Sequence, residues 1–275
     1  MKAKEVLNFF LEAADWVDRS DTVDRIIIGD PEKEISDILV SLYPDLKAIN
    51  YAIDHGFDML ITHEPTFWFH LNEVENLLGM QDDAPRKKTG LDKMRMIEES
   101  GLVILRNHDV WDRMPKYGIP WAWANFLGLH GEPVAIGGAG YQHRYDVEPI
   151  PFDEFARKVA LRTAAIGEPA VQVIGDGKRL VSKIGIGTGC ACDLEVFIEM
   201  GCDAAVVTDD GCIYWKDIKW AMDIDYPVIR VNHATSEEVG MITLAQYINE
   251  KLNGVKAVYL PHKSGIRIIT ATNVS

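Results

Sequence analysis

Short apolar runs and amphipathic stretches alternate along most of the chain. Apolar runs of about four to eight residues bounded by turn residues are typical of buried strands, whereas apolar positions spaced three and four apart are typical of helices. Strands are predicted at residues 25–29, 36–43, 57–62, 102–105, 142–147, 171–174, 180–186, 204–207, 228–231 and 257–260. Helices are predicted at residues 2–17, 44–56, 71–80, 89–101, 121–129, 152–161, 193–200, 213–222 and 237–252. This alternation favours an α/β fold in both halves of the chain.

Local turn and capping residues refine these elements. Pro44 begins the helix between the strands 36–43 and 57–62, which form a β-α-β unit and are therefore expected to be parallel. Thr89 is expected to cap a helix that follows a polar linker. The turn Gly175-Asp176-Gly177 is expected to join the two strands on either side of it.

Two strands of the first half end in polar side chains. The strand 57–62 stops at Thr62-His63-Glu64-Pro65, where the proline cannot donate to a strand ladder. The strand 102–105 is followed by side chains of the same kind: His108, Asp109 and Asp112. Ligands of open α/β sheets bind at the carboxyl ends of the strands. The repetition makes a chance loop with a histidine and a glutamate the weaker interpretation.

The second half contains a similar pattern near the C-terminus. The strand 228–231 is followed by His233, and Thr235 or Ser236 is expected to cap a helix that begins at Glu237. Two interpretations are open: a capping box beside a loop histidine, or an imidazole and a carboxylate turned toward one pocket. With the first half, the second interpretation gives two imidazoles and three carboxylates: His63, Glu64, Asp112, His233 and Glu237. Such a set suits divalent first-row metals, and three gathered carboxylates would repel one another without a cation.

Composition narrows the functional classes. The 275-residue chain is 47% hydrophobic and 25% charged, which is typical of a globular protein. Its net charge of −14 argues against nucleic-acid binding, which requires a basic surface. No apolar run of about 18 residues occurs, and the N-terminal segment is amphipathic and acidic rather than a signal peptide. We predict a cytoplasmic protein without a nucleic-acid or membrane partner, in which the four cysteines are reduced thiols.

A glycine-rich turn in the second half carries two open interpretations. Gly187-Thr188-Gly189 leads into a helix, so it is either an anion site at the helix N-terminus or a tight strand-to-helix connection. Cys190 and Cys192 lie beside it, and their spacing does not match a zinc knuckle. Asp209 and Asp210 follow another strand and are candidates for supporting a metal ligand.

The order of these motifs resembles the Nif-three-like dinuclear metal-centre proteins, a family also described as GTP cyclohydrolase type 2 homologues. The family pattern is a strand ending in Thr-His-His-Pro, a His-x-x-x-Asp, a Gly-Thr-Gly turn, and a late His-x-x-x-Glu ahead of a helix. In this chain the four motifs read Thr62-His63-Glu64-Pro65, His108–Asp112, Gly187-Thr188-Gly189 and His233–Glu237. Their order and spacing agree over nearly the whole chain.

This resemblance implies a fold, a ligand set and an assembly. The implied fold is α/β, a single unit of residues 1–275 that contains two similar, interlocked α/β lobes with mixed sheets. The lobes comprise approximately residues 1–130 and 131–275, and the metal site is expected in the cleft between them. The implied cofactors are two divalent metal ions (manganese, iron, zinc or magnesium), bridged in part by the last glutamate. The implied ligands are His63, Glu64, Asp112, His233 and Glu237. The implied assembly is a toroidal homohexamer.

One residue departs clearly from the family pattern. Glu64 stands where the family has the second of two adjacent histidines. A carboxylate is a harder ligand than an imidazole, so manganese, iron(II) or magnesium should compete better against zinc. Three placements of Glu64 are open: it ligates one ion, bridges two, or points away. Asn232, in place of a family glycine before His233, is a smaller departure.

Two functions follow from this set. The first is a metal-dependent hydrolase acting on a nucleotide-like or other small substrate of unidentified chemistry, with His108 or Asp109 acting as base or orienting the attacking water. The alternative is a non-catalytic hexameric adaptor or metal carrier. A deep polar pocket beside the metal ligands would favour the enzyme, and a shallow, fully ligated site would favour the alternative.

Overall fold

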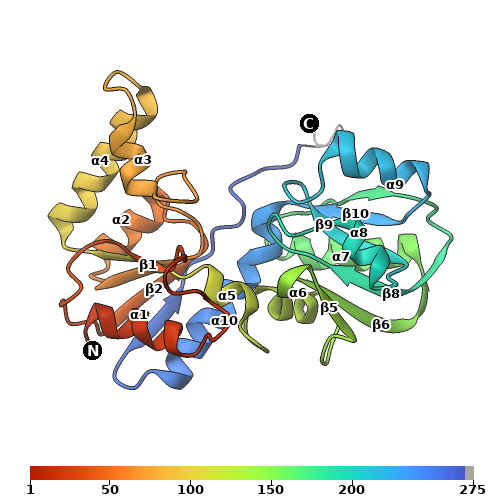
Figure 1. Cartoon of the computed structure of the whole chain (residues 1–275), viewed down its shortest axis with the longest axis horizontal. Helices are drawn as coiled ribbons and strands as arrows, with labels where there is room; N and C mark the ends of the chain where they lie inside the picture. Colours follow the sequence, from red (N-terminus) through yellow and green to blue (C-terminus); the bar gives the residue numbers. More distant parts are fainter. Residues whose placement is uncertain (270–275) are drawn as a thin grey trace. The chain divides into compact units, whose positions relative to one another are not determined.

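Two α/β units, each built around one mixed sheet, make up the chain (Figure 1). The computed structural model describes residues 1–269. Unit 1 comprises Met1–Gly118 and Met241–His262, and unit 2 comprises Ile119–Gly240 with the described residues from Lys263 onward. The predicted α/β fold with mixed sheets is confirmed. Both units combine two separate segments, unlike the contiguous lobes 1–130 and 131–275 that the resemblance suggests.

Unit 1 contains a five-stranded sheet in the order β1-β4-β3-β2-β11. Its strands are β1 (Arg25–Ile28), β2 (Asp37–Ser41), β3 (Met59–Thr62), β4 (Val103–Arg106) and β11 (Lys256–Tyr259). Only the β1–β4 pair is antiparallel. Val40 of β2 lies opposite Ile61 of β3 in a parallel register, which confirms the predicted β-α-β unit.

Helices cover both faces of the unit 1 sheet (Figure 1). They are α1 (Ala3–Glu12), α2 (Leu46–Asp54), α3 (Glu73–Gly79), α4 (Pro85–Ser100), α5 (Asp109–Arg113) and the later part of α10 (His233–Lys251). Ile49 of α2 and Ile97 of α4 pack on Leu60 in a buried apolar cluster. Figure 1 shows α1 and α10 on the opposite face. The ring of Trp111 in α5 contacts the rings of Phe10 and Tyr247 edge to face.

Unit 2 contains a six-stranded sheet in the order β5-β6-β8-β9-β10-β7. Its strands are β5 (Ala135–Gly137), β6 (Gln142–Pro151), β7 (Gln172–Ile174), β8 (Leu180–Ile186), β9 (Ala204–Thr208) and β10 (Val228–Val231). Its helical segments are α6 (Ile119–Leu127), η1 (Gly138–Gly140), α7 (Phe152–Ala164), α8 (Leu194–Glu199), η2 (Tyr214–Ile218), α9 (Lys219–Asp223) and the start of α10. The three central strands β8, β9 and β10 are parallel, so their carboxyl ends share one edge.

Two predicted helix starts are wrong, each for an identifiable reason. Helix α4 begins at Pro85, which needs no amide donor in a first turn, and the Thr89 hydroxyl donates to the Pro85 carbonyl at 3.1 Å. The turn predicted between β7 and β8 lies between them, and β7 pairs antiparallel with β10. Helix α10 begins at His233 because the Asn232 side chain accepts the Ala234 amide at 3.1 Å and caps it.

Residues 1–269 include no helix with the length and apolar character needed to cross a bilayer.

Candidate metal-binding groups

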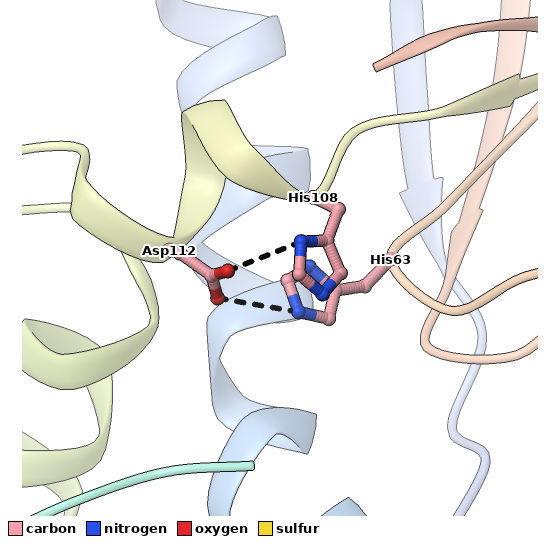
Figure 2. Close-up of side chains that lie close together, drawn as sticks. All are labelled: His63, His108 and Asp112. Carbon is pink, nitrogen blue, oxygen red and sulfur yellow. Dashed lines mark ion pairs between the residues drawn. The ribbon is translucent and has the colours of Figure 1, made fainter. Parts of the chain in front are cut away.

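The carboxyl ends of β3 and β4 assemble the first group of candidate ligands. His63 follows the last residue of β3, and His108 follows β4 after one intervening residue. Asp112 lies one turn further along, on α5. Figure 2 shows both imidazoles directed at the Asp112 carboxylate. We call His63, His108 and Asp112 the unit 1 group.

The spacing of the unit 1 group suits one divalent ion. The two Asp112 oxygens lie 3.4 Å from His63 Nε2 and 3.2 Å from His108 Nδ1. The two imidazoles stack with centroids 4.4 Å apart and an interplanar angle of 13°. All three ligand atoms lie within 4.8 Å of one another. Atoms that bind one ion at about 2.0–2.3 Å are at most roughly 4.6 Å apart, so only small movements are needed.

The protonation of His63 indicates a missing positive charge in this group. Its Nδ1 lies 3.3 Å from the Asn107 carbonyl, which can only accept, so Nδ1 carries the hydrogen. In a neutral ring Nε2 then turns a lone pair toward the carboxylate of Asp112, which is also an acceptor. His63 is fully buried and Asp112 is 7% exposed. A cation bound to both atoms, or a proton on Nε2, relieves this contact, so the donor set fits a divalent ion.

The charge state of Asp112 also suits a ligand. Burial acts to raise the pKa of Asp112, but the imidazoles of His108 and His63 outweigh burial and hold the pKa below its usual value. Metal ligands must bind in the deprotonated form, which this carboxyl adopts at neutral pH.

Asp109 orients His108 rather than joining the group. Its Oδ1 lies 2.9 Å from His108 Nδ1, and its Oδ2 accepts the Thr22 hydroxyl at 2.7 Å and the Val23 amide at 3.2 Å. Burial acts to raise the pKa of Asp109, but hydrogen bonds from His108 and Thr22 hold it well below its usual value. Because this ionised carboxylate only accepts, His108 Nδ1 carries a hydrogen and Nε2 of the neutral ring has a lone pair.

A buried carboxylate that the sequence analysis missed holds α5 in place. Asp24 is 4% exposed and accepts the backbone amides of His108, Asp109 and Val110. Burial raises the pKa of Asp24 to about 6. It lies 84 residues from His108 in sequence, so no local spacing could reveal it.

A pocket with both polar and apolar lining residues adjoins the unit 1 group. Its volume is about 190 Å³, and its lining includes Arg25, His70, Glu73 and Arg106. The buried Arg106 donates to the His63 carbonyl at 3.1 Å and to His70 Nδ1 at 3.1 Å, and the His70 ring meets the His108 ring edge to face at 5.0 Å. Burial lowers the pKa of His70, and the charges of His108 and Arg106 act in the same direction. The sequence analysis did not single out His70.

Glu64, the departure from the family pattern, is half-buried in the loop after β3. Its amide donates to the Leu42 carbonyl at 3.0 Å, and its own carbonyl accepts the Thr62 hydroxyl at 3.3 Å. These contacts fix the backbone of the loop. The side chain is not a member of the unit 1 group, so its predicted role as a ligand stays a prediction.

The second group lies at the carboxyl ends of the parallel strands of unit 2. Cys190 follows β8, Asp210 follows β9, and His233 follows β10. Their ligand atoms lie within 4.8 Å of one another, and we call these three residues with Glu237 the unit 2 group. His233 Nδ1 lies 3.0 Å from Asp210 Oδ2, and Nε2 lies 3.1 Å from Glu237 Oε2.

The position of His233 in α10 bears on the two sequence interpretations of this region, because His233 is the first residue of the helix and not a loop residue. His233 and Glu237 are four residues apart in one helix and therefore share a face. The imidazole and the carboxylate thus meet, as the second interpretation expected. A neutral imidazole has one N–H, so one of its two carboxylate neighbours faces a lone pair. The unit 2 group therefore has the same need for a cation or an added proton as the unit 1 group.

The Gly187-Thr188-Gly189 turn supports the unit 2 group by close approach. Gly189 has φ +52°, and a Cβ there would lie 2.3 Å from Glu237 Oε1. Its amide donates to the Ser236 hydroxyl at 3.2 Å. Because Gly189 has no side chain, the backbone of the turn can lie directly against the first turns of α10. Asp209 supports the same helix, since Oδ1 accepts the His233 amide at 2.7 Å.

Cys190 and Asp210 were absent from the predicted ligand set, although a signal for both existed. Each follows a strand of the parallel core, as His63 and His233 do. Asp210 faces the imidazole itself, whereas Asp209 holds the helix backbone, so the two neighbouring aspartates have different roles.

The family model for Duf34/NIF3 (NGG1p interacting factor 3) matches residues 1–264. The chain belongs to the Duf34/NIF3 family. The resemblance drawn from the four motifs is thereby confirmed.

Relatives of this NIF3-family chain are distant in sequence and similar in structure. The GTP cyclohydrolase 1 type 2 homolog of Haemophilus influenzae is 22% identical over 218 residues, which are 78% of this chain and 80% of that protein. The Staphylococcus aureus hypothetical protein SA1388 has a TM-score of 0.78 at 18% identity, over 98% of this chain and 99% of that one. A Bacillus cereus protein related to NIF3 has a TM-score of 0.76 at 14% identity, over the same shares. The structural matches establish the fold.

Proposed function

We propose that this NIF3-family protein binds divalent metal ions through the unit 1 group and the unit 2 group. The observation that carries the proposal occurs in both groups: a nitrogen of His63 or His233 lies within 3.4 Å of a carboxylate oxygen, and a neutral ring cannot donate to all of its acceptor neighbours without a bound cation or an added proton. A divalent ion satisfies such pairs, and carboxylate and imidazole together suit first-row metals.

The finer proposal is that the protein holds two ions in one dinuclear centre. The family resemblance supports it. Glu64 then makes the ligand set harder, which favours manganese, iron(II) or magnesium over zinc. The thiol of Cys190 has the opposite effect on metal preference, because soft ligands favour zinc.

A metal-dependent hydrolase is the enzymatic form of this proposal. When bound, a divalent ion supplies Lewis-acid activation of a water molecule. In this form the ion would be held by His63 and Asp112, and His108 is placed to take a proton at Nε2, because its Nδ1 hydrogen is held by Asp109 and Asp112. Arg25 and Arg106 line the adjoining pocket and can bind an anionic or carbonyl oxygen.

The size of that pocket bears on the substrate. Its volume of about 190 Å³ is below the range of about 300–1,000 Å³ typical of complete ligand sites. It therefore suits one polar group of a nucleotide-like or other small substrate. The name of the Haemophilus influenzae relative points to a nucleotide, and we carry that to this chain only as one substrate class to test.

The second candidate is a metal carrier or adaptor without catalysis. It is favoured by the exposure of the unit 2 group, where Cys190 is exposed and the Asp210 side chain is 64% exposed. An ion held by exposed ligands can be passed to another protein more readily than one held in a closed site.

Metal analysis followed by substrate screening separates these outcomes. Protein purified without added metal is treated with a chelator, and manganese, iron(II), zinc and magnesium are titrated back by calorimetry. Two bound ions per chain support the dinuclear form, and no binding of any of the four ions contradicts the proposal. A panel of phosphoester, nucleotide and amide substrates then tests the loaded protein. Turnover that a His108→Ala variant loses while keeping its metal supports the hydrolase.

The assembly and location also remain proposals. We propose a homohexamer with threefold and twofold axes, in the cytoplasm, on the basis of the family resemblance. Light scattering at micromolar concentration tests the assembly, and a monomer there would refute it.

A further inference from the structure

A second pocket of unit 1 shares no residue with either metal-binding group. Its volume is about 390 Å³, within the range of about 300–1,000 Å³ typical of small-molecule sites. It is lined by residues at the start of α2, on α4, and in the loop after His63, among them Tyr43, Trp68 and Lys93.

Lys93 brings a buried positive charge to this pocket. The residue is 5% exposed, and its Nζ donates to the Thr66 carbonyl at 2.7 Å. The carboxylates of Asp45 and Glu73 act to raise the pKa of Lys93, but burial outweighs them and lowers this pKa to about 8. An anion bound beside Nζ would offset more of the cost of burying this charge.

Aromatic side chains flank the charge. The rings of Phe67 and Trp68 lie 5.9 Å from Lys93 Nζ. Trp68 has φ +66°, a strained conformation for a residue with a side chain, and the residue is 38% exposed. Such strain persists where the surroundings enforce it, often at ligand-binding positions. Tyr43, also in the lining, is held by stacking on His262 at 5.6 Å.

The charges of the lining favour a ligand with a single negative charge. Two lysines, Lys47 and Lys93, and one aspartate, Asp45, line the pocket. The Asp45 carboxylate is engaged as the cap of α2, since Oδ1 accepts the Ala48 amide at 2.8 Å. A ring with a flat face can stack on the exposed indole, which is an arrangement aromatic groups prefer.

We propose that this pocket binds a small aromatic carboxylate, with the carboxylate on Lys93 Nζ and the ring against Trp68. This site is separate from the proposed metal function, because none of its lining residues belongs to either metal-binding group. A metal-independent ligand site is therefore expected in unit 1.

Binding of benzoate to the full chain tests the proposal, with benzamide as the neutral analogue of the same shape. Both are titrated by calorimetry into chelator-treated protein, so that benzoate cannot bind through a metal ion. We expect benzoate to bind, and benzamide to bind at least about tenfold more weakly, because a hydrogen bond to a charged group contributes about 1.5–3 kcal/mol. No benzoate binding at millimolar concentration, or equal binding of both, would overturn the proposal.

Two substitutions locate the site. Lys93→Met removes the charge and keeps an apolar stem, and we expect it to weaken benzoate binding to the level of benzamide. Trp68→Ala should weaken both ligands. Lys88→Met, at an exposed lysine of the same helix, is the matched control and should bind benzoate as the parent does. Thermal unfolding identifies any variant that fails to fold, and the comparison of benzoate with benzamide on the parent protein stands without the variants. Unchanged benzoate affinity in a folded Lys93→Met protein would contradict the assignment.

Discussion

The two candidate metal-binding groups are built alike and differ in enclosure. In both, a histidine and a carboxylate follow the carboxyl ends of parallel strands, and an aspartate caps the helix that carries a ligand: Asp24 for α5 and Asp209 for α10. His63 and Asp112 are buried, whereas Cys190 and Asp210 are exposed. The same scaffold thus yields an enclosed site of imidazole and carboxylate and an open site that includes a thiol. We expect the first to hold its ion more tightly and the second to exchange it more readily.

The largest expected effect is the loss of the central carboxylate of the enclosed group. Asp112→Asn should lower the metal affinity of the unit 1 group by at least about 100-fold. Mutating a residue that only hydrogen-bonds to a metal ligand already lowers metal affinity by about 10–100-fold. Asp210→Asn, at an exposed carboxylate, should lower the affinity of the unit 2 group by less, about tenfold. Calorimetric titration measures both effects, with Asp92→Asn on the exposed face of α4 as the control. Equal losses for the two variants would break the distinction between an enclosed and an open group.

The residue that departs from the family pattern tests the metal preference. Glu64→His should restore the paired imidazoles and raise the preference for zinc over manganese, on the order of tenfold. If Glu64 is a ligand, Glu64→Ala should remove the ion that Glu64 holds and spare the other, because His63, Asp112, His233 and Glu237 remain. Competition titrations and metal analysis of the two variants provide the measurement. Metal content unchanged from the parent in Glu64→Ala would show that Glu64 does not ligate.

Thiol labelling distinguishes the open group from its surroundings. Cys190 is exposed, whereas Cys192, Cys202 and Cys212 are buried, and burial raises the pKa of each buried thiol to about 12. One of the four thiols should therefore react with a maleimide in the native protein. Zinc should slow that reaction by about tenfold, and magnesium should slow it less, because thiolate is a soft ligand. A zinc-independent rate would mean that Cys190 does not bind the ion, and Cys190→Ser identifies the labelled residue.

The smallest expected effect concerns the glycine turn beside the open group. Gly189→Ala places a methyl group 2.3 Å from Glu237 Oε1, so it should displace that carboxylate and weaken metal binding to the unit 2 group several-fold. Gly101→Ala is a matched control, since Gly101 has φ +68° and nothing lies within 4 Å of its added Cβ. Both variants should lose about 1–2 kcal/mol of stability from the left-handed backbone. If they also bind metal alike, the contact between Gly189 and Glu237 has no role in the site.

Most of the candidate site could be predicted because its signals are local in sequence. A strand that ends in polar residues marks the edge of the sheet where ligands gather, and this placed His63, His108 and His233 correctly at such ends. Asp24 and the β7–β10 pairing could not be predicted, since both depend on contacts between segments far apart in the chain. The start of α10 was wrong because Asn232 caps as well as Thr235 or Ser236, and local preference did not separate them.

The division of unit 1 into two segments has a consequence for synthesis on the ribosome. Strand β11 (Lys256–Tyr259) pairs with β2 (Asp37–Ser41), and the Ser41 hydroxyl donates to the Leu260 carbonyl. All the strands of unit 2 precede β11 in the chain, so the ribosome synthesises them before β11. Unit 2 can therefore complete its sheet first, while the nascent β2 has a free edge. Free edges are the strands most exposed to wrong pairing, so the middle of the chain is expected to fold before its beginning.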